Sequence, residues 1–314
     1  MALSEAESPA PASTATGELR QETLTERDID AGLALSDAAG WNQTGDDWGL
    51  FIRRGRTIGL RDAGGGWVAT AAALPYGRDR GWISMVLVAE AWRHRGLASR
   101  LLDDCVAHLR AEGSVPVLDA TPAGAAVYRR LGFVSGFEID RWERPASPAP
   151  GRVAPRAAAL SLSAPPTPPV ADVRPTGLVD LDALLALDRA ATGLERRFLL
   201  ASFLSRLDTQ AWQAEDGRGF VIARAGRRAT QVGPLVANDA DQAAALLDTA
   251  IASVAGDAGR AIFLDLPCAH RPLADRLERL GFARQRPFVR MSLGATEAPR
   301  LGTGMFVLAG PEFG

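Results

Sequence analysis

The sequence contains no lysine, and only two cysteines and two tyrosines occur among its 314 residues. Cys105 and Cys268 stand in different halves of the chain, without the spacing of a disulfide framework or a zinc site, so we expect neither, and no metal. No apolar run approaches the roughly 18–20 residues that span a bilayer. The first residues carry acidic side chains and prolines where an export signal would place basic residues and an apolar core. These absences predict a cytoplasmic protein without a membrane partner.

The charges of the chain nearly cancel. Its 35 basic residues, all arginine, stand against 37 acidic residues and leave a net charge of −2. Such a balance gives no field that would recruit nucleic acid. The length favours two domains with cores of ordinary size, and it leaves open whether the protein is a monomer or a homodimer.

A segment rich in proline and alanine divides the chain near its middle, and such a composition is typical of an extended linker. On both sides the apolar periodicity predicts the same order of elements: a strand, two helices, three strands, then helix, strand, helix and strand. The two copies end alike, in "YRRLGF" and "LERLGF". We therefore predict a disordered tail over residues 1–18, a first domain over 19–145, a linker over 146–170 and a second domain over 171–314.

The stretch "WRHRGLAS", residues 92–99, follows the apolar run "ISMVLV" and precedes an amphipathic pattern over 97–110. Binding a pyrophosphate requires a strand that delivers a loop, small residues that let main-chain N–H groups approach, and a helix N-terminus facing the anion. Gly96 and Ala98 are the small residues, and Arg93 and Arg95 can add charge-assisted hydrogen bonds. Taken alone, such a string is also how an ordinary surface helix begins.

Tyr128 lies in a short helical pattern, 35 residues after Arg93 and four before Gly132. A lone helical tyrosine is usually a packing residue whose hydroxyl finds a partner at the edge of a core. Its occurrence together with the basic loop favours a functional interpretation.

The strings "VLVAEAWRHRGLASRLL" and "YRRLGF" resemble the GNAT superfamily of acyl-CoA-dependent N-acyltransferases, over residues 19–144. The resemblance implies an α/β fold of two GNAT-like domains, each with a mostly antiparallel central sheet flanked by helices. It implies that acetyl-CoA is the acyl donor and that Tyr128 protonates the departing thiolate. Main-chain groups of a strand would pair with the pantetheine arm, and the basic loop would hold the pyrophosphate. The residues implied are Val86, Leu87 and Val88 for the arm, and Arg93, His94, Arg95, Gly96, Leu97, Ala98 and Ser99 for the pyrophosphate.

The second half resembles the C-terminal domain of a tandem GNAT subfamily through "DRAATGLERRFLL", "VGPLVANDADQAAALL" and "FVRMSLG". In place of the basic loop it has "ANDADQAA", where Asp239 and Asp241 at a helix start would repel a pyrophosphate. Leu277 stands four residues before Gly281, at the place of the tyrosine, and has no proton to donate. We therefore expect no coenzyme A site in the second half.

The sequence gives weaker signals for the residues that bind the acyl acceptor. Asp47 and Glu90 are the candidates for a general base, although Glu90 is also an ordinary solvated loop residue. The string "GWNQTGDDW" falls between the first two helices, which in this fold border the acceptor pocket, and Asp188 and Arg196 match motif positions of the tandem subfamily. The candidate acceptor residues are Trp41, Asn42, Thr44, Asp46, Trp48, Asp188 and Arg196. Structural alternatives remain for three features: Asp46 as a helix N-cap, Trp48 as a core residue, and Asp188 with Arg196 as an ion pair.

These features favour an acetyl-CoA-dependent N-acetyltransferase that transfers an acyl group to the amine of a small molecule or peptide by direct attack in a ternary complex. Two alternatives remain at this point. One is a non-catalytic acyl-CoA-binding regulatory or interaction protein, and the other is an O-acyltransferase. An intact proton donor at Tyr128 favours an enzyme.

Overall fold

The structure is a computed structural model that describes residues 18–77, 79–146, 173–255, 260–295 and 297–314. The predicted linker and almost all of the predicted N-terminal tail lie outside these residues. No helix of the described residues is long and apolar enough to cross a membrane.

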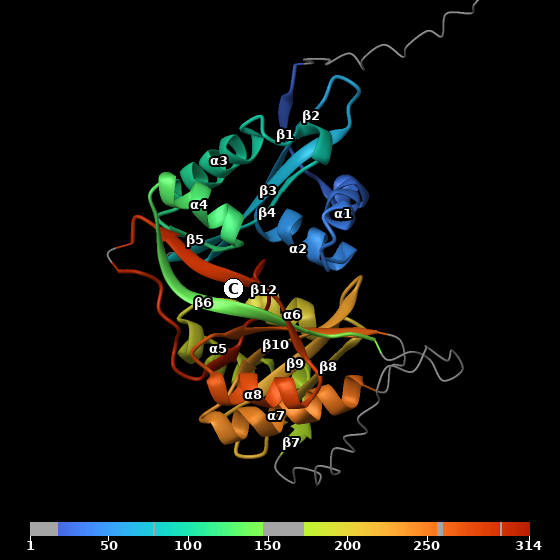
Figure 1. Ribbon diagram of the computed structural model, residues 1–314, viewed down its shortest axis with the longest axis vertical. Helices are drawn as coiled ribbons and strands as arrows, with labels where there is room; N and C mark the ends of the chain where they lie inside the picture. The colour runs from blue at the N-terminus through green and yellow to red at the C-terminus, as the bar shows by residue number, and fades with distance from the viewer. Residues whose placement is uncertain (1–17, 78, 147–172, 256–259, 296) are drawn as a thin grey trace, which may run out of the picture.

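The elements follow the predicted order in both halves (Figure 1). In the first half they are β1 (Arg20–Thr23), η1 (Glu26–Asp28), α1 (Ile29–Ala38), α2 (Gly45–Arg54), β2 (Arg56–Arg61), β3 (Trp67–Tyr76), β4 (Arg80–Val88), η2 (Glu90–Trp92), α3 (Leu97–Ala111), β5 (Val115–Ala120), α4 (Pro122–Arg130) and β6 (Phe133–Arg144). In the second half they are β7 (Val173–Pro175), η3 (Leu178–Asp180), α5 (Leu181–Thr192), α6 (Arg197–Leu204), β8 (Thr209–Ala214), β9 (Phe220–Ala225), β10 (Ala229–Val236), α7 (Ala240–Val254), β11 (Ala261–Pro267), α8 (Arg271–Arg279), β12 (Ala283–Leu293) and β13 (Met305–Val307).

All strands of the described residues belong to one 13-stranded sheet, in the order β1-β2-β3-β4-β5-β12-β6-β11-β10-β9-β8-β7, with β13 paired to β10. Only the pairs β4–β5 and β10–β11 in this part of the chain are parallel. Each parallel pair is connected through a helix, α3 or α7, as a parallel crossover requires. The expected mixed α/β fold with a mostly antiparallel sheet is confirmed.

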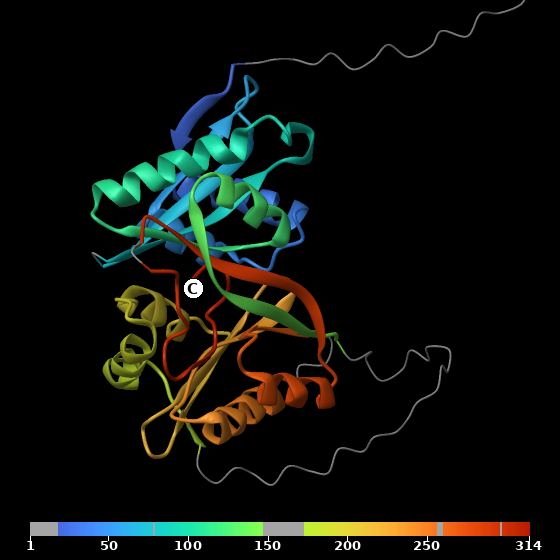
Figure 2. The same ribbon diagram turned by 60° about the vertical axis from the view of Figure 1, so that its left-hand side comes forward.

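The two halves exchange their last long strands. β12 of the second half lies between β5 and β6, and β6 of the first half lies between β12 and β11. β6 and β12 pair with each other from Phe133↔Leu293 to Glu143↔Ala283. Figures 1 and 2 show both strands crossing between the upper and lower parts of the molecule. The sequence repeat predicted two copies of one unit and gave no sign that they share strands.

Three apolar cores stabilise this arrangement. One packs α3 and α4 on the first half of the sheet, and a second packs α7 and α8 on the second half. The third lies between the halves, and there Trp48 and Phe51 from α2 join Leu199 and Phe203 from α6. Because this shared core is as well buried as the other two, the halves form one packed body.

Candidate functional site

In the first half, two parallel strands pair only at their beginnings. β4 and β5 are matched from Arg80↔Val115 to Trp82↔Val117. Beyond Val117, β5 pairs in the described part of the chain only with β12, which lies along its other edge. From Ile83 to Val88, β4 pairs with β3 on one side, and among the described residues no strand lies on the other. An open strand edge presents main-chain donors and acceptors to an extended ligand.

A bulge marks β4 where the opening begins. The register with β3 shifts between Thr70 and Ala72, and opposite this shift Met85 has a φ of 53°. A methionine rarely adopts this left-handed conformation, and here it is held by burial of the side chain and by the Thr70 hydroxyl, which donates to the Met85 carbonyl at 3.0 Å. Bulges beside active sites redirect side chains and end regular pairing.

The N-terminus of α3 follows this open edge in the chain. Its N-cap residue, Gly96, has a φ of 75° and open space around its Cα, and no side chain caps the helix. The first-turn N–H groups of a helix lack intrahelical partners and favour an anion. Of the two flanking arginines, Arg93 donates from Nε to the Val88 carbonyl (3.3 Å) and Arg95 stacks on Trp92. Both are exposed beside the helix start.

The corresponding place in the second half is occupied by the chain itself. β10 and β11 also pair only at their beginnings, from Ala229↔Ala261 to Val232↔Leu264. Beyond that point β13 pairs with β10, and the Leu308 N–H donates to the Asp265 carbonyl of β11 at 3.0 Å. The Asp239 side chain caps α7 by accepting from the Gln242 N–H. Thus the second half offers neither an open edge nor an uncapped helix at this place.

A cavity of about 140 Å³ opens where β4 and β5 diverge. Both halves of the chain line it. The lining residues are Trp41, Gln43, Ile83, Ser84, Met85, Val86, Leu118, Asp119, Ala120, Thr121, Tyr128, Arg141, Arg286, Phe288, Pro311 and Glu312. The structure therefore brings together three of the predicted residues, Trp41, Val86 and Tyr128.

Tyr128 reaches the cavity from α4. Thr121 caps this helix and Pro122 begins it, which fixes its start at the end of β5. The Tyr128 ring lies against Gly124 and at 5.8 Å from the Phe133 ring. Burial raises the pKa of the Tyr128 phenol above its usual value of 10. The hydroxyl is therefore protonated at neutral pH and able to donate a proton into the cavity.

Glu312 is the functional candidate that sequence reasoning missed. Its carboxylate is 8% exposed and lines the cavity; Oε1 lies 3.4 Å from Arg224 Nη2, whereas Oε2 has no hydrogen-bond partner in the described part of the chain. Burial raises the pKa of the Glu312 carboxyl, against the opposing effect of Arg224 and Arg141. Asp119, the other carboxylate in the cavity, binds Arg290 through both oxygens at 2.9 Å.

Glu312 is positioned by the segment that follows β13. Arg224 donates to the Ala309 carbonyl (2.6 Å), Trp82 to Pro311 (3.0 Å) and Tyr76 to Phe313 (2.8 Å). The Phe313 ring stacks on Phe51 at 5.0 Å. No local sequence pattern distinguishes Glu312 from the other acidic residues, because its position depends on contacts with both halves.

Two further polar atoms in the cavity lack partners among the described residues. They are Gln43 Oε1 and Ser84 Oγ, and both residues are at most 9% exposed. Buried polar atoms are nearly always hydrogen-bonded in folded proteins. Together with Glu312 Oε2, these are buried acceptor atoms without partners in residues that line the cavity.

The predicted base Asp47 lies elsewhere. Its Oδ2 accepts from the Thr44 N–H and hydroxyl in a capping box at the start of α2, and its Oδ1 binds Arg206 at 2.8 Å. Thr44, and not Asp46, is therefore the N-cap residue. Asp46 is exposed in a groove beside Arg206, away from Tyr128. Glu90 is exposed in η2 and does not line the cavity.

Three other predicted acceptor residues hold the fold together. Trp48 is fully buried and its Nε1 donates to the Ser36 hydroxyl at 3.2 Å. Asp188 and Arg196 form a fully buried, bidentate ion pair, and Arg196 also donates to the main-chain oxygen of Gly314. The structural alternatives describe these three side chains, and none of them lines the cavity that contains Tyr128.

Asn42 joins the two halves. Its side-chain oxygen accepts from the N–H groups of Arg228 and Ala229, both at 2.9 Å, and its Nδ2 donates to the Ala229 carbonyl at 3.2 Å. It does not line the cavity that contains Tyr128. The predicted substrate residue is an interdomain contact.

Replacement of Asn42 by alanine is expected to lower the free energy of unfolding by about 1–3 kcal/mol, because buried main-chain groups lose their partners. Michaelis constants should not change, since the Asn42 side chain does not line the cavity. Chemical denaturation and steady-state kinetics on the same preparation measure both effects. If the Michaelis constant for the acceptor rose while stability was unchanged, Asn42 would be a substrate-binding residue.

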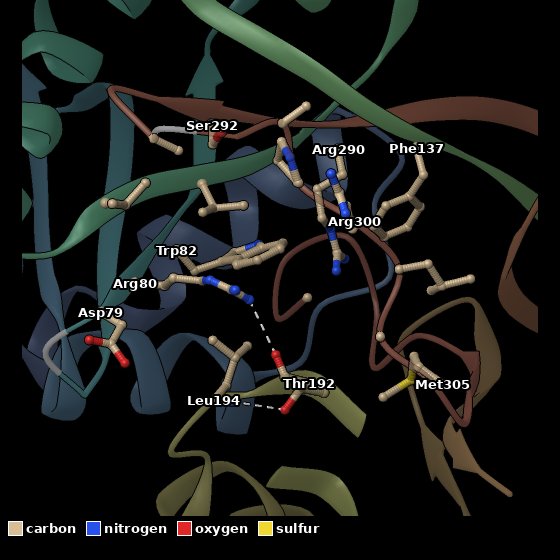
Figure 3. A pocket seen from close by; sticks show the side chains of 18 of the residues that line it. Asp79, Arg80, Trp82, Phe137, Thr192, Leu194, Arg290, Ser292, Arg300 and Met305 are labelled. Atoms are coloured by element: carbon tan, nitrogen blue, oxygen red, sulfur yellow. Dashed lines mark hydrogen bonds between the residues drawn. The ribbon is translucent and has the colours of Figure 1, made fainter. Parts of the chain in front are cut away.

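A second cavity, of about 350 Å³, lies between the halves near the start of β4 (Figure 3). Figure 3 shows Trp82, Arg290 and Arg300 on its walls, and Arg80 donating to the Thr192 carbonyl, at 3.2 Å. It contains neither Tyr128 nor the open part of β4. The smaller cavity is therefore the candidate active site.

Two family models match the chain. The acetyltransferase (GNAT) family matches residues 21–133, and an acetyltransferase (GNAT) domain matches residues 184–306. Between them they cover both halves, from β1 to the end of α4 and from α5 to β13. No curated protein sequence matches the chain significantly.

Solved structures resemble the protein over both halves. A putative acetyltransferase from Pyrococcus horikoshii is 17% identical with a TM-score of 0.74, covering 98% of this chain and 100% of its own. A tandem GNAT protein from the clavulanic acid biosynthesis pathway is 17% identical with a TM-score of 0.62, covering 89% and 100%. A GCN5-related N-acetyltransferase from Sphaerobacter thermophilus is 14% identical with a TM-score of 0.57, covering 91% and 98%. At these identities the resemblance establishes the fold.

Proposed function

This chain is a tandem member of the GNAT acetyltransferase family, a fold that supports acyl transfer, and from that premise we propose that it transfers an acetyl group from acetyl-CoA to the amine of a small molecule. The observation that carries the proposal is the contrast between the two halves. The first half has an open strand edge, an uncapped helix and Tyr128 in one place, and the second half fills the same place with β13.

The residues of the first half fit coenzyme A. The open edge of β4 from Ile83 to Val88 would pair with the pantetheine arm as an added strand would. The first turn of α3, from Leu97 to Ser99, would hold the pyrophosphate, with Arg93 and Arg95 beside it. Gly96 has no Cβ, and the space next to it is empty, which lets an anion approach the amides. Acetyl-CoA would supply an acetyl group activated as a thioester.

The side chains of the cavity account for the proton transfers. An amine is protonated at neutral pH and must lose a proton before it attacks a thioester, since an ammonium has no lone pair. Glu312 lines the cavity, and its buried Oε2 has no hydrogen-bond partner in the described residues, so its carboxylate would bind the ammonium and accept this proton. Tyr128 would protonate the sulfur as the carbon–sulfur bond breaks. Main-chain N–H groups at the open end of β4 would stabilise the developing oxyanion.

The choice between nitrogen and oxygen acceptors rests on the charge of the site. A hydroxyl acceptor is neutral, whereas an amine binds as a cation and complements the buried Glu312 carboxylate. The carboxylate therefore favours the amine. A screen that scores thiol release separates the two classes, and turnover of alcohols without turnover of amines would replace the proposal by O-acylation.

Acetyl-CoA at millimolar concentration is expected to raise the melting temperature, because a ligand that binds only the folded state stabilises it. Gly96→Ala should weaken this effect about tenfold in apparent affinity, since alanine resists the left-handed conformation and turns the α3 amides away. Gly65→Ala is the matched control. Gly65 also has a positive φ, of 81°, with open space, but it lies in the turn between β2 and β3. If both variants lost affinity for acetyl-CoA equally, the α3 N-terminus would not be part of the acetyl-CoA site.

A further inference from the structure

Arg286 brings a positive charge to the candidate active site from the second half of the chain. It lies on β12, is half-buried and lines the cavity with Tyr128 and Glu312. Its recorded hydrogen bond runs from Nε to the Gln285 side-chain oxygen at 3.2 Å, and in the described part of the chain no carboxylate oxygen lies within 4.0 Å of its nitrogens. The guanidinium therefore lines the cavity without an ion-pair contact in these residues, and the carboxylates of Asp265, Glu143 and Glu312 act on it from a longer distance.

A bulge in β12 places Arg286 on this face. The register with β6 shifts between Arg284 and Arg286, so that Arg284 is opposite Trp142 and Arg286 is opposite Arg141. Arg284 stacks on Trp142 in the α7 and α8 core and pairs with Asp140. Without the extra residue, the alternation of a strand would put both arginines on one face. The bulge is thus what directs Arg286 into the cavity.

The groups around Arg286 disfavour its positively charged form. Arg141 also lines the cavity, and its guanidinium is bound by Asp265 through both oxygens at 2.8 Å, so Asp265 is already engaged. Arg286 and Arg141 both approach the ring of Phe288, at 5.8 and 5.6 Å. Burial and the nearby Arg141 lower the pKa of Arg286. A second guanidinium held beside a neutralised one is disfavoured unless an anion joins it.

The cavity therefore presents opposite charges from separate elements. Arg286 comes from β12, and Glu312 comes from the segment after β13. The volume of about 140 Å³ admits only a small molecule. A carboxylate or phosphate binds a guanidinium in a bidentate manner, and an ammonium binds a carboxylate. A single small ligand that carries both groups would neutralise both sides of the cavity.

We propose that the acceptor is a small zwitterion, an amine that also carries a carboxylate or another anionic group, and that Arg286 binds this anionic group while Glu312 faces the amine. The inference rests on the proposed function and specifies its substrate class. Arg286 is a specificity residue, since it would touch the substrate at a distance from the reacting nitrogen. Its contribution should therefore be to acceptor binding.

The test compares paired acceptors in a thiol-release assay at saturating acetyl-CoA. Each pair contains an amino acid and its carboxamide, such as glycine with glycinamide and β-alanine with β-alaninamide, and aminomethylphosphonate and taurine represent other anions. The protein is expected to use the anionic member of a pair at least about tenfold better in kcat/KM, in keeping with a charge-assisted bidentate contact. Arg286→Gln should remove this preference through the KM of the anionic acceptor. The KM of acetyl-CoA should not change.

Arg284→Gln is the matched control, because it removes the same group from the same strand on the opposite face. It should keep the wild-type preference, and melting temperatures establish that both variants are folded. Equal use of acid and amide by the wild type, an unchanged preference in Arg286→Gln, or turnover of no anionic amine overturns the inference. Failure of acetyl-CoA to stabilise the same preparation overturns the proposed function instead, so the two failures are distinguishable.

Discussion

Replacement of Tyr128 by phenylalanine is expected to lower kcat about 100-fold with little change in the KM of acetyl-CoA. A positioned general acid contributes roughly 10²–10⁴-fold. The lower end applies here because a thiol, with a pKa of about 8.5 by analogy with cysteine, is already a good leaving group. The phenylalanine ring preserves the packing against Gly124 and Phe133. The phenolic hydroxyl is the only group of the site that the substitution removes.

The pH dependence gives this prediction a second readout. Burial raises the pKa of Tyr128 above 10, so the phenol remains the proton donor throughout the neutral and mildly alkaline range. The wild-type rate should therefore show no loss of this proton donor up to about pH 9, a unit below the usual phenol pKa, and Tyr128→Phe should lower the profile by a constant factor there. Steady-state rates from pH 6 to pH 10 test this. Turnover equal to wild type across that range would show that Tyr128 is a packing residue.

Tyr76→Phe is the control, since Tyr76 is the only other tyrosine in the sequence. Its hydroxyl donates to the Phe313 carbonyl at 2.8 Å in the core between the halves, and it does not line the cavity. Loss of this hydrogen bond should cost about 1–3 kcal/mol of unfolding free energy. The effect of Tyr76→Phe should thus appear in stability, and in activity only through the segment that positions Glu312, whereas that of Tyr128→Phe should appear in kcat.

Glu312→Gln is expected to reduce kcat/KM for the acceptor by about 10²-fold or more, because glutamine neither attracts an ammonium nor accepts its proton. The carboxylate is the active form. Burial raises its pKa above the usual 4.5, so the wild-type rate should fall as the pH decreases through that raised pKa. Glu312→Gln should abolish this acidic limb. Measurement of kcat/KM from pH 4.5 to pH 8 for both proteins tests the assignment.

Stability separates this effect from unfolding. A glutamate whose pKa is raised in the folded state destabilises that state when it is ionised, so the neutral glutamine should not lower the free energy of unfolding at neutral pH. Arg224 keeps its hydrogen bonds to the Gly233 and Ala309 carbonyls. Glu297→Gln removes an exposed carboxylate and serves as the charge control. If kcat/KM of Glu312→Gln still fell at acidic pH as it does in the wild type, the base would be another group.

The donor side of the site could be predicted from sequence because it depends on neighbours in the chain. A strand, Gly96, the α3 pattern and Tyr128 follow one another within residues 83–128, and each leaves a local signal. The secondary structure was predictable for the same reason. Apolar periodicity marked the order of the elements in both halves.

The acceptor side could not be predicted, because contacts distant in sequence form it. Glu312 and Arg286 line one cavity with Tyr128 only once β13 has paired with β10 and β12 has paired with β5. The aspartates near the start of α2 resembled catalytic candidates in the sequence, yet Asp47 binds Arg206, 159 residues away. An ion pair of this kind leaves no pattern in a single chain. The polar string in which Asp47 stands therefore gave a base candidate that does not line the cavity with Tyr128.

The exchange of β6 and β12 also bears on how the protein is made and retained. While the chain is being synthesised, β5 and β6 wait for a partner strand that ends at residue 293, so the first half spends this interval with unpaired edges that favour aggregation. A gene fragment that encodes only the first half would encode the donor site without the strand that completes its sheet. The second copy thus supplies a strand on which the sheet of the first half depends, so truncation of the chain before β12 would also disturb the candidate donor site.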